Sequence, residues 1–451
     1  MTLLSGRLRF PFYAAGAVSA AVFIYFLWIV LGPGPMHFVG GKRVPIGTYG
    51  AGDPTGVPEV LSRAPLIERG RYLARAADCE ACHTSKDGVP YSGGRAFVLP
   101  FGTLYSTNLT PDPETGIGRY TNTDFLKVLH RGIGLGGKRL YPAMPYASYT
   151  YMSDADALAI KAYLFTLQPI RMEGPQTNLK FPFNQRWLMG IWAFIFNPDK
   201  RFEPNAQRDA QWNRGAYLAE AMAHCGECHT PRNLLQALNN RAKFSGTAQA
   251  GWRAYNITPD RASGLGDWSD ADIANYLITG HADGHGTAAG PMGEAVDDSF
   301  KYLTQADAAA IVAYLRSVPA VATRDLPRPK TRVAPSSAEE GVAGNVSPLG
   351  KAVYAGACAS CHGWSGVSPV MAVATLTGVR AVNDPTAINV AQVIISGALG
   401  HNGVDTANMP AFGDAYSDEE IASVANYVTA RFGARTSALT AENVAKLRAS
   451  D

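Results

Sequence analysis

The hydrophobic pattern of the chain opens with one long apolar run. Residues from Phe10 to Gly32 carry no charge, two arginines precede them, and Tyr25 and Trp28 stand near the far end. Such a run is long enough to cross a bilayer, and aromatic side chains favour the membrane interface. The alternative is a cleaved signal peptide, whose apolar core is usually shorter, roughly 7–15 residues. The pattern therefore predicts a retained transmembrane anchor within residues 1–45.

A second pattern is an internal repeat of three helical segments. They run from Asp154 to Leu167, from Gln305 to Val318 and from Asp418 to Phe432, and each holds an aliphatic residue three positions before a Tyr. Upstream of each, an equivalent segment pairs a Gly with an aromatic residue, at residues 68–74, 213–219 and 349–354. We expect the Gly to let the two helices of each repeat approach closely.

The composition fits several small domains better than one large one. At 451 residues a single core is not expected, and the 46 glycines and 29 prolines indicate loop-rich units. The net charge of +3 gives no reason to expect nucleic acid as a partner. No run of alternating β-branched residues is long enough to predict a sheet.

The candidate chemistry is a Cys-x-x-Cys-His run that occurs three times and uses all six cysteines. Two thiols one helical turn apart can form thioethers to the vinyl groups of one porphyrin, and the adjacent His can ligate the iron. Zinc would need pairs of such motifs to converge, and disulfides would give no reason for the His. The sequence therefore predicts three covalent haem c groups. The thioether cysteines are Cys79, Cys82, Cys225, Cys228, Cys358 and Cys361, and the axial histidines are His83, His229 and His362.

These motifs define the predicted architecture. The expected fold class is all-α, with three tandem class-I-cytochrome-c-like domains plus the N-terminal transmembrane helix. The first two repeats share an Asn-x-Thr-Pro-Asp turn that the third lacks, which suggests a pair with an appended third domain. The expected divisions are an anchor at 1–45, a linker at 46–65, domain 1 at 66–170, a connector at 171–209, domain 2 at 210–319, a linker at 320–347, domain 3 at 348–435 and a tail at 436–451.

The connector is distinguished by its aromatic content. It contains Phe181, Phe183 and then an apolar stretch from Trp187 to Phe196, which is too short to span a bilayer. A buried helix is the favoured interpretation. A segment that lies in the membrane interface is the alternative, because Trp is favoured there.

The sixth ligand of each iron decides between an electron carrier and a catalyst. Methionine would give a six-coordinate carrier, whereas an open position would allow ligand chemistry. We predict Met144, Met292 and Met409, each of which follows its motif at a distance suited to one wrap around a haem. The chain carries no Ser/His/Asp set and no P-loop, so no catalytic residue is predicted. The competing ligands are Met152, Met172 and Met189, for which core packing is the other explanation, Met371, which lies too near its His, and the loop histidines His281, His285 and His401.

The chain resembles the triheme cytochrome c subunits of membrane-bound bacterial dehydrogenases of the acetic-acid-bacteria type, which oxidise alcohols, aldehydes or sugars. The likeness covers about Pro65 to the end. It rests on the three haem motifs and on the segments Arg69–Ala74, Tyr105–Asp112, Gly116–Gly118, Leu140–Tyr146, Phe181–Trp187 and His229–Arg232. The resemblance implies a large catalytic partner subunit, with a small iron–sulfur or accessory subunit as a further candidate, and electron transfer through the three haems to ubiquinone. It also supports the three methionine ligands.

Two expectations depend on this resemblance and on the compartment. Covalent haem attachment takes place outside the bacterial cytoplasm, so the haem domains are expected on the periplasmic face of the inner membrane. A retained span is more similar to cytochromes of molybdenum-containing aldehyde dehydrogenases, so an aldehyde dehydrogenase is the preferred partner. The alternative is a quinoprotein alcohol dehydrogenase or a flavoprotein sugar or gluconate dehydrogenase. A c-type haem peroxidase and an oxidase-associated cytochrome are further alternatives.

Overall fold

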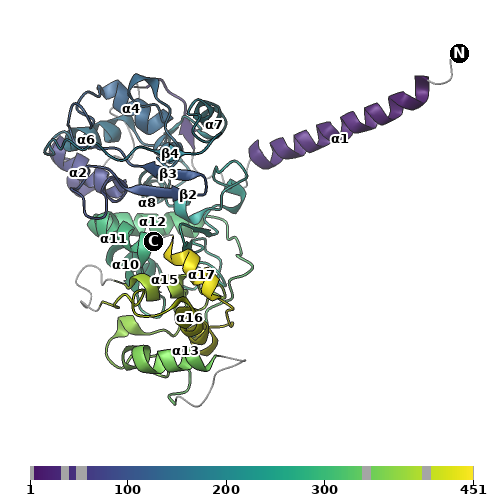
Figure 1. Ribbon diagram of the computed structural model, residues 1–451. Helices are drawn as coiled ribbons and strands as arrows, with labels where there is room; N and C mark the ends of the chain where they lie inside the picture. The colour runs from purple at the N-terminus through teal and green to yellow at the C-terminus, as the bar shows by residue number, and fades with distance from the viewer. Residues whose placement is uncertain (1–4, 32–39, 47–57, 338–346, 399–407, 450–451) are drawn as a thin grey trace.

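The computed structural model describes residues 5–31, 40–46, 58–337, 347–398 and 408–449. Helix α1 (Ser5–Leu31) extends away from a body in which three helical units follow one another in chain order (Figure 1). The end of α1 contacts the second unit, where the Arg241 guanidinium lies 3.6 Å from the centre of the Trp28 ring and donates a hydrogen bond to the Trp28 carbonyl.

Helix α1 does not bear out the predicted membrane span. Among the residues that the structure describes, no helix is both long enough and apolar enough to cross a membrane. The described side chains of α1 run from Tyr13 to Trp28, a stretch shorter than the roughly 20 residues that a span needs. The prediction of an N-terminal transmembrane helix is therefore wrong.

Helices build each of the three units. The first unit contains α2 (Leu66–Ala76), α3 (Cys79–Cys82), α4 (Asn122–Arg131), α5 (Tyr146–Tyr149) and α6 (Asp154–Leu164). The second contains α8 (Ala210–Tyr217), which continues as a π-helical turn to Met222, then α9 (Gly226–His229), α10 (Asp270–Thr279), α11 (Gly290–Asp298) and α12 (Gln305–Ser317). The third contains α13 (Pro348–Val353), continued by a π-helical turn to Cys358, then α14 (Ala359–His362), α15 (Ile388–Ser396), α16 (Asp418–Phe432) and α17 (Ala441–Arg448).

The prediction of an all-α fold is also wrong, because short antiparallel strands accompany these helices. Each strand has only two to four residues, and glycine turns such as that at Gly102 (φ +132°) join them, so the sequence offers no alternating run to recognise. The strands are β1 (Gly41–Lys42), β2 (Ala96–Leu99), β3 (Gly102–Tyr105), β4 (Asn178–Leu179), β5 (Arg201–Phe202), β6 (Thr247–Gln249), β7 (Trp252–Ala254), β8 (His281–Ala282) and β9 (Gly286–Thr287). The paired strands are β1 with β5, β2 with β3, β3 with β4, β6 with β7 and β8 with β9.

A glycine brings the first and last helices of each unit together. A Cβ atom added to Gly70 of α2 would lie 1.9 Å from the Ala159 carbonyl oxygen of α6. At Gly215 of α8 the corresponding distance, to a carbonyl of α12, is 1.8 Å, and at Gly350 of α13 the distance to a carbonyl of α16 is 2.2 Å. No side chain fits at such distances, so the close approach predicted from the repeat is present in all three units.

The buried side chains form two cores rather than three. One core extends from Tyr72 to Val318 and includes both the first and the second unit. The other extends from Ala334 to Leu447 and belongs to the third unit. The first two units are therefore one packed body, and the third is attached to it.

Two tyrosines at equivalent repeat positions cross the boundary between the first two units. Tyr72 of α2 donates a hydrogen bond to Asp307 at the start of α12, and Tyr217 of α8 donates one of 2.6 Å to Asp156 at the start of α6. Each hydroxyl also accepts from a backbone amide beside that carboxylate. The exchange is reciprocal, so the two units pack as a pseudo-symmetric pair.

The connector between these units places an apolar helix on the surface. None of the residues of α7 (Leu188–Phe196) is buried, so the buried-helix interpretation is wrong. Exposure reaches 64% at Trp187, 52% at Ile191 and 88% at Phe194, and Phe181 and Phe183 nearby are also exposed. We call these five side chains the aromatic surface.

Candidate functional site

The first two cysteine pairs lie on short helices that follow the first helix of each unit along the chain. Cys79 and Cys82 bound the single turn of α3, and Cys225 and Cys228 flank the start of α9. Burial raises the pKa of the Cys225 thiol to about 12. Two thiols one turn apart on a short helix suit thioether attachment to one porphyrin.

The third pair is arranged in the same way. Cys358 ends the π-helical turn after α13, Cys361 lies within α14, and burial raises the pKa of Cys358 to about 11. Within the described part of the chain, no group of three or more His, Cys, Asp or Glu side chains could hold a metal ion. The converging cysteine pairs that a zinc site would require are therefore not found there.

Each motif histidine is held by a backbone carbonyl. The Nδ1 atoms of His83, His229 and His362 lie 2.6 Å from the carbonyl oxygens of Thr107, Tyr255 and Ala374. A carbonyl can only accept, so Nδ1 carries the proton and Nε2 keeps its lone pair for the iron. Burial lowers the pKa of all three histidines, which keeps them neutral. This tautomer is the one that an axial haem ligand requires, so the residues fit the group.

The shared turn of the first two units supplies these carbonyls. Asn108 follows Thr107 directly, accepts hydrogen bonds from the amide and hydroxyl of Thr110, and donates to the Ile170 carbonyl. Asn256 follows Tyr255 and makes the matching bonds with Thr258 and Val321. The sequence analysis found the turn but missed its role, which is to hold a carbonyl against the haem-binding His. In the third unit a short 3₁₀ turn that contains Ala374 takes its place.

The predicted methionine ligands lie at the edges of the two cores. Met144 and Met292 are partly buried against the first core, and Met409 is partly buried against the second. Met144 precedes α5, and Met292 lies in α11, whereas Met409 pairs through its backbone with Ala398. Met152 is fully buried within the core, so packing accounts for it. The structure thus leaves the three predicted methionines as candidates without testing ligation directly.

The competing loop histidines have other partners. Nδ1 of His281 lies 2.9 Å from the Thr287 hydroxyl and its Nε2 lies 3.0 Å from Asp283. The His285 ring stacks on Trp268 at 3.9 Å. His401 lies outside the described residues. These contacts favour methionine over bis-His ligation in the second unit.

The first and second motifs are neighbours across the boundary between their units. Arg95 donates to the Ala81 carbonyl inside the first motif and forms a 2.7 Å ion pair with Glu294 of α11. On the same boundary, Ser148 donates to Glu227 inside the second motif. The two attachment segments are therefore linked by direct side-chain contacts.

Comparison with known proteins identifies the family. The chain is 40% identical over 433 residues to the fructose dehydrogenase cytochrome subunit of Gluconobacter japonicus, which covers 89% of this chain and 87% of that protein. The chain belongs to the family of dehydrogenase cytochrome c subunits. The gluconate 2-dehydrogenase cytochrome c subunit of Pantoea cypripedii is 39% identical and covers 85% of this chain and 89% of its own length. The quinone-type alcohol dehydrogenase cytochrome c subunit of Gluconacetobacter polyoxogenes is 35% identical and covers 85% and 84%.

Family models match two of the three units of this cytochrome subunit. Residues 213–319 match the model described as cytochrome c. Residues 348–428 match the model described as cytochrome c oxidase, cbb3-type, subunit III. These cytochrome c domains imply covalently bound haem c, and the resemblance inferred from the sequence is confirmed.

Proposed function

We propose that this cytochrome subunit relays electrons from a catalytic dehydrogenase subunit, through three covalently bound haem c groups, to ubiquinone. The observation that carries the proposal is the threefold Cys-x-x-Cys-His run in which each His is fixed by a backbone carbonyl. When bound, haem supplies a one-electron iron couple whose potential depends on axial ligands and burial. The three relatives described above are named as cytochrome subunits of dehydrogenases, which supports the same assignment.

The residues of the chain have separate tasks in this relay. In each unit the two cysteines would hold the haem covalently, and the carbonyl-bound Nδ1–H leaves Nε2 of the His free to ligate the iron. Met144, Met292 and Met409 would supply the second ligand, which would leave no position for a substrate and would favour electron transfer. A peroxidase would need one open position, and carbon monoxide binding to the reduced protein would reveal it.

The site of action in this proposal is the periplasmic face of the inner membrane. The support is the chemistry of haem attachment and the aromatic surface, because Trp and Phe exposed together are typical of proteins that lie on a bilayer. Contact through this surface would place the chain beside ubiquinone dissolved in the lipid.

For the partner we propose a sugar, sugar-acid or alcohol dehydrogenase. The preference for an aldehyde dehydrogenase depended on the retained span, which the structure does not bear out. The relatives described above are named for fructose, gluconate and alcohol dehydrogenases. The match to an oxidase subunit model covers only the third unit, so it does not support an oxidase function for the whole chain.

The test is purification in mild detergent, followed by identification of the co-purifying subunit and assay of a ubiquinone analogue with sugars, sugar acids and alcohols. We expect a large dehydrogenase subunit, a chain mass that includes three haems, and quinone reduction that is lost when Cys225 and Cys228 are both replaced by Ser. A complex that oxidises its substrate with an artificial dye but never reduces the quinone would overturn the proposal.

A further inference from the structure

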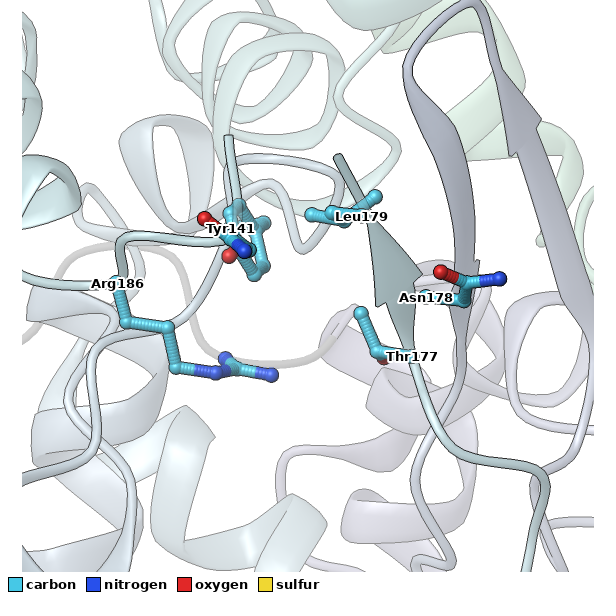
Figure 2. Close-up of a pocket in the computed structure, with 6 residues that line it drawn as sticks. Tyr141, Thr177, Asn178, Leu179 and Arg186 are labelled. Atoms are coloured by element: carbon cyan, nitrogen blue, oxygen red, sulfur yellow. The ribbon is translucent and has the colours of Figure 1, made fainter. Parts of the chain in front are cut away.

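A polar pocket opens beside the aromatic surface. Its volume is about 250 Å³, and Figure 2 shows the Arg186 and Tyr141 side chains directed into the space between the segment that leads to α7 and the strand β4. Tyr141 is fixed there, because its hydroxyl donates a 2.7 Å hydrogen bond to the Phe183 carbonyl. The lining residues are Tyr141, Thr177, Asn178, Leu179, Asn184 and Arg186.

The pocket carries uncompensated positive charge. The Arg186 guanidinium stacks 4.8 Å from the centre of the Tyr141 ring and donates to the Arg139 carbonyl, which holds it in place. Burial lowers the pKa of Lys138, and the nearby charge of Arg186 lowers it further. In the described parts of the chain, no carboxylate lies within 4.0 Å of Lys138, Arg139 or Arg186, although most arginines near the core are paired with acids.

The aromatic surface begins at the edge of this pocket. Trp187 follows Arg186 directly, and the exposed face of α7 continues from it through Ile191 to Phe194. On the other side, Phe183 stacks on Phe101 at 4.0 Å beside the strand β3. A charged head group in the pocket would therefore have its apolar part lying along the aromatic surface.

We propose that the pocket binds the phosphate group of an anionic phospholipid whose acyl chains lie along the aromatic surface. The planar guanidinium of Arg186 matches the geometry of phosphate, and Thr177 and Asn184 provide further polar groups. The polar lining is unsuited to a flat apolar quinone ring, which argues for an anion. The inference rests on the membrane contact proposed above, and basic residues next to interfacial aromatic residues are the usual basis for selecting anionic lipid.

The first experiment measures flotation of the full-length haem-loaded chain with vesicles of phosphatidylcholine, with and without phosphatidylglycerol. We expect phosphatidylglycerol to strengthen binding, and Arg186→Gln to reduce that gain about fivefold while binding to pure phosphatidylcholine stays unchanged. Arg171→Gln removes the same charge from an exposed ion pair with Glu114 and is expected to keep the gain. An Arg186→Gln chain that keeps the full gain would overturn the proposal.

A second measurement separates the pocket from the membrane contact. Short-chain phosphatidylglycerol below its micelle concentration and inorganic phosphate are titrated into the purified chain, and tryptophan fluorescence reports binding. We expect the lipid to bind more tightly than phosphate, and Arg186→Gln to abolish both signals with an unchanged haem spectrum. Equal affinity for the two ligands would mean an adventitious ion only, and it would overturn the lipid assignment. The double variant with Trp187→Ala and Phe194→Ala should not bind either kind of vesicle. If this variant still bound both, the proposed membrane contact would be overturned instead.

Discussion

At the scale of single residues, the three haem-binding histidines share one geometry although their surroundings differ. In each case a carbonyl 2.6 Å from Nδ1 fixes the tautomer, whether a turn locked by Asn or a 3₁₀ turn supplies that carbonyl. A ligating His with a fixed second hydrogen bond is oriented before the metal is bound. The ligand on the opposite side is then the variable that sets each potential.

Replacement of Met144 by His tests that ligand in the first unit. Cys79, Cys82 and His83 remain, so we expect full haem content, whereas the potential of one haem falls by roughly one to a few tenths of a volt, within the ~0.8 V range that axial ligands span. Potentiometric titration followed by absorbance measures it. Met152→Leu, a change of similar volume in the fully buried core, is the control and should leave all potentials unchanged. A shift in the control and none in Met144→His would remove Met144 from the site.

The pH dependence of stability differs between two aspartates at the same helix position. Asp156 and Asp124 both lie three residues after an N-cap hydroxyl, but burial raises the pKa of Asp156, whereas hydrogen bonds from Thr121 lower the pKa of Asp124. The folded protein binds the proton of Asp156 more tightly than the unfolded chain does. Its contribution therefore favours folding at low pH and is lost as the pH rises above about 4, by at most about 1.4 kcal/mol per pH unit. For Asp124 the sign is opposite, and its contribution is lost as the pH falls.

The measurement is the free energy of unfolding in urea at several pH values. Relative to the unsubstituted chain, Asp156→Asn should become more stable as the pH rises, because it lacks a charge that burial disfavours. Asp124→Asn should become less stable over the same range, since it lacks a favoured charge. Parallel pH profiles for the two variants would contradict the assignment of burial as the dominant cause at Asp156.

At the scale of elements, the sequence predicted the last helix of each repeat and missed the strands. The segment Gln305 to Val318 became α12, Gln305–Ser317, and Asp418 to Phe432 became α16 with the same bounds. Helical periodicity over three turns is a strong signal, and a capping box with Ser417 marks the start of α16. Strands of two to four residues have no periodicity to detect, so their existence depends on tertiary contacts.

The sequence likewise predicted only part of the candidate site, namely the part that a local motif encodes. The Cys and His positions follow from a local motif, but the carbonyl partners of the histidines lie 12 to 26 residues away in sequence, so only the fold shows the pairing. The Arg186 pocket could not be predicted for the same reason, because its walls come from residues 141, 177–179, 184 and 186. The exposure of α7 was predicted wrongly, since an apolar helix is usually buried and sequence does not show which surface it meets.

Substitution by Ala is expected to change the stability in opposite directions at two glycines of the third unit. Gly350→Ala would bring a Cβ within 2.2 Å of the Ser423 carbonyl, so α13 must move away from α16, and we expect a loss of about 2–3 kcal/mol in stability. Gly356 lies two residues before its haem motif, and a Cβ there would meet nothing within 4 Å. Gly356→Ala should therefore be neutral or stabilising by about 0.5–1 kcal/mol.

Thermal unfolding and haem content of the two variants check this. A lower unfolding temperature of the third unit, followed through the absorbance change of its haem, is expected in Gly350→Ala alone. If Gly356→Ala were destabilised as much and incorporated less haem, helix contact would not be the reason for the glycine at position 350, and a requirement of the attachment step itself would be.

At the scale of the whole molecule, the chain is a shared two-unit body with a third unit docked on it. The shared core, the reciprocal Tyr72 and Tyr217 bonds and the Arg95–Glu294 pair make the first two units inseparable. The third unit instead docks on β7, through Arg253, which bonds Asp384 at 3.0 Å and Asp325 at 2.6 Å. Tyr255, whose carbonyl holds His229, also donates its hydroxyl to Asp384. The docking contact thus reaches the residue that orients the second haem ligand.

Asp384→Asn is therefore expected to loosen the third unit and to disturb the second haem together. Asp384 is fully buried, and its loss leaves Arg253 without its buried partner, which costs about 3–5 kcal/mol of docking free energy. Small-angle scattering should show a larger radius of gyration, and potentiometry should show a changed potential for the second haem with the first unaffected.

The control is Asp325→Asn, which removes the other partner of the same arginine. The Asp325 side chain is 55% exposed, so the expected cost is below about 1 kcal/mol and the molecule stays compact. Equal expansion in both variants would mean that total charge at Arg253 holds the third unit. An expansion in Asp384→Asn with no change in the second haem would mean that docking and ligand orientation are independent.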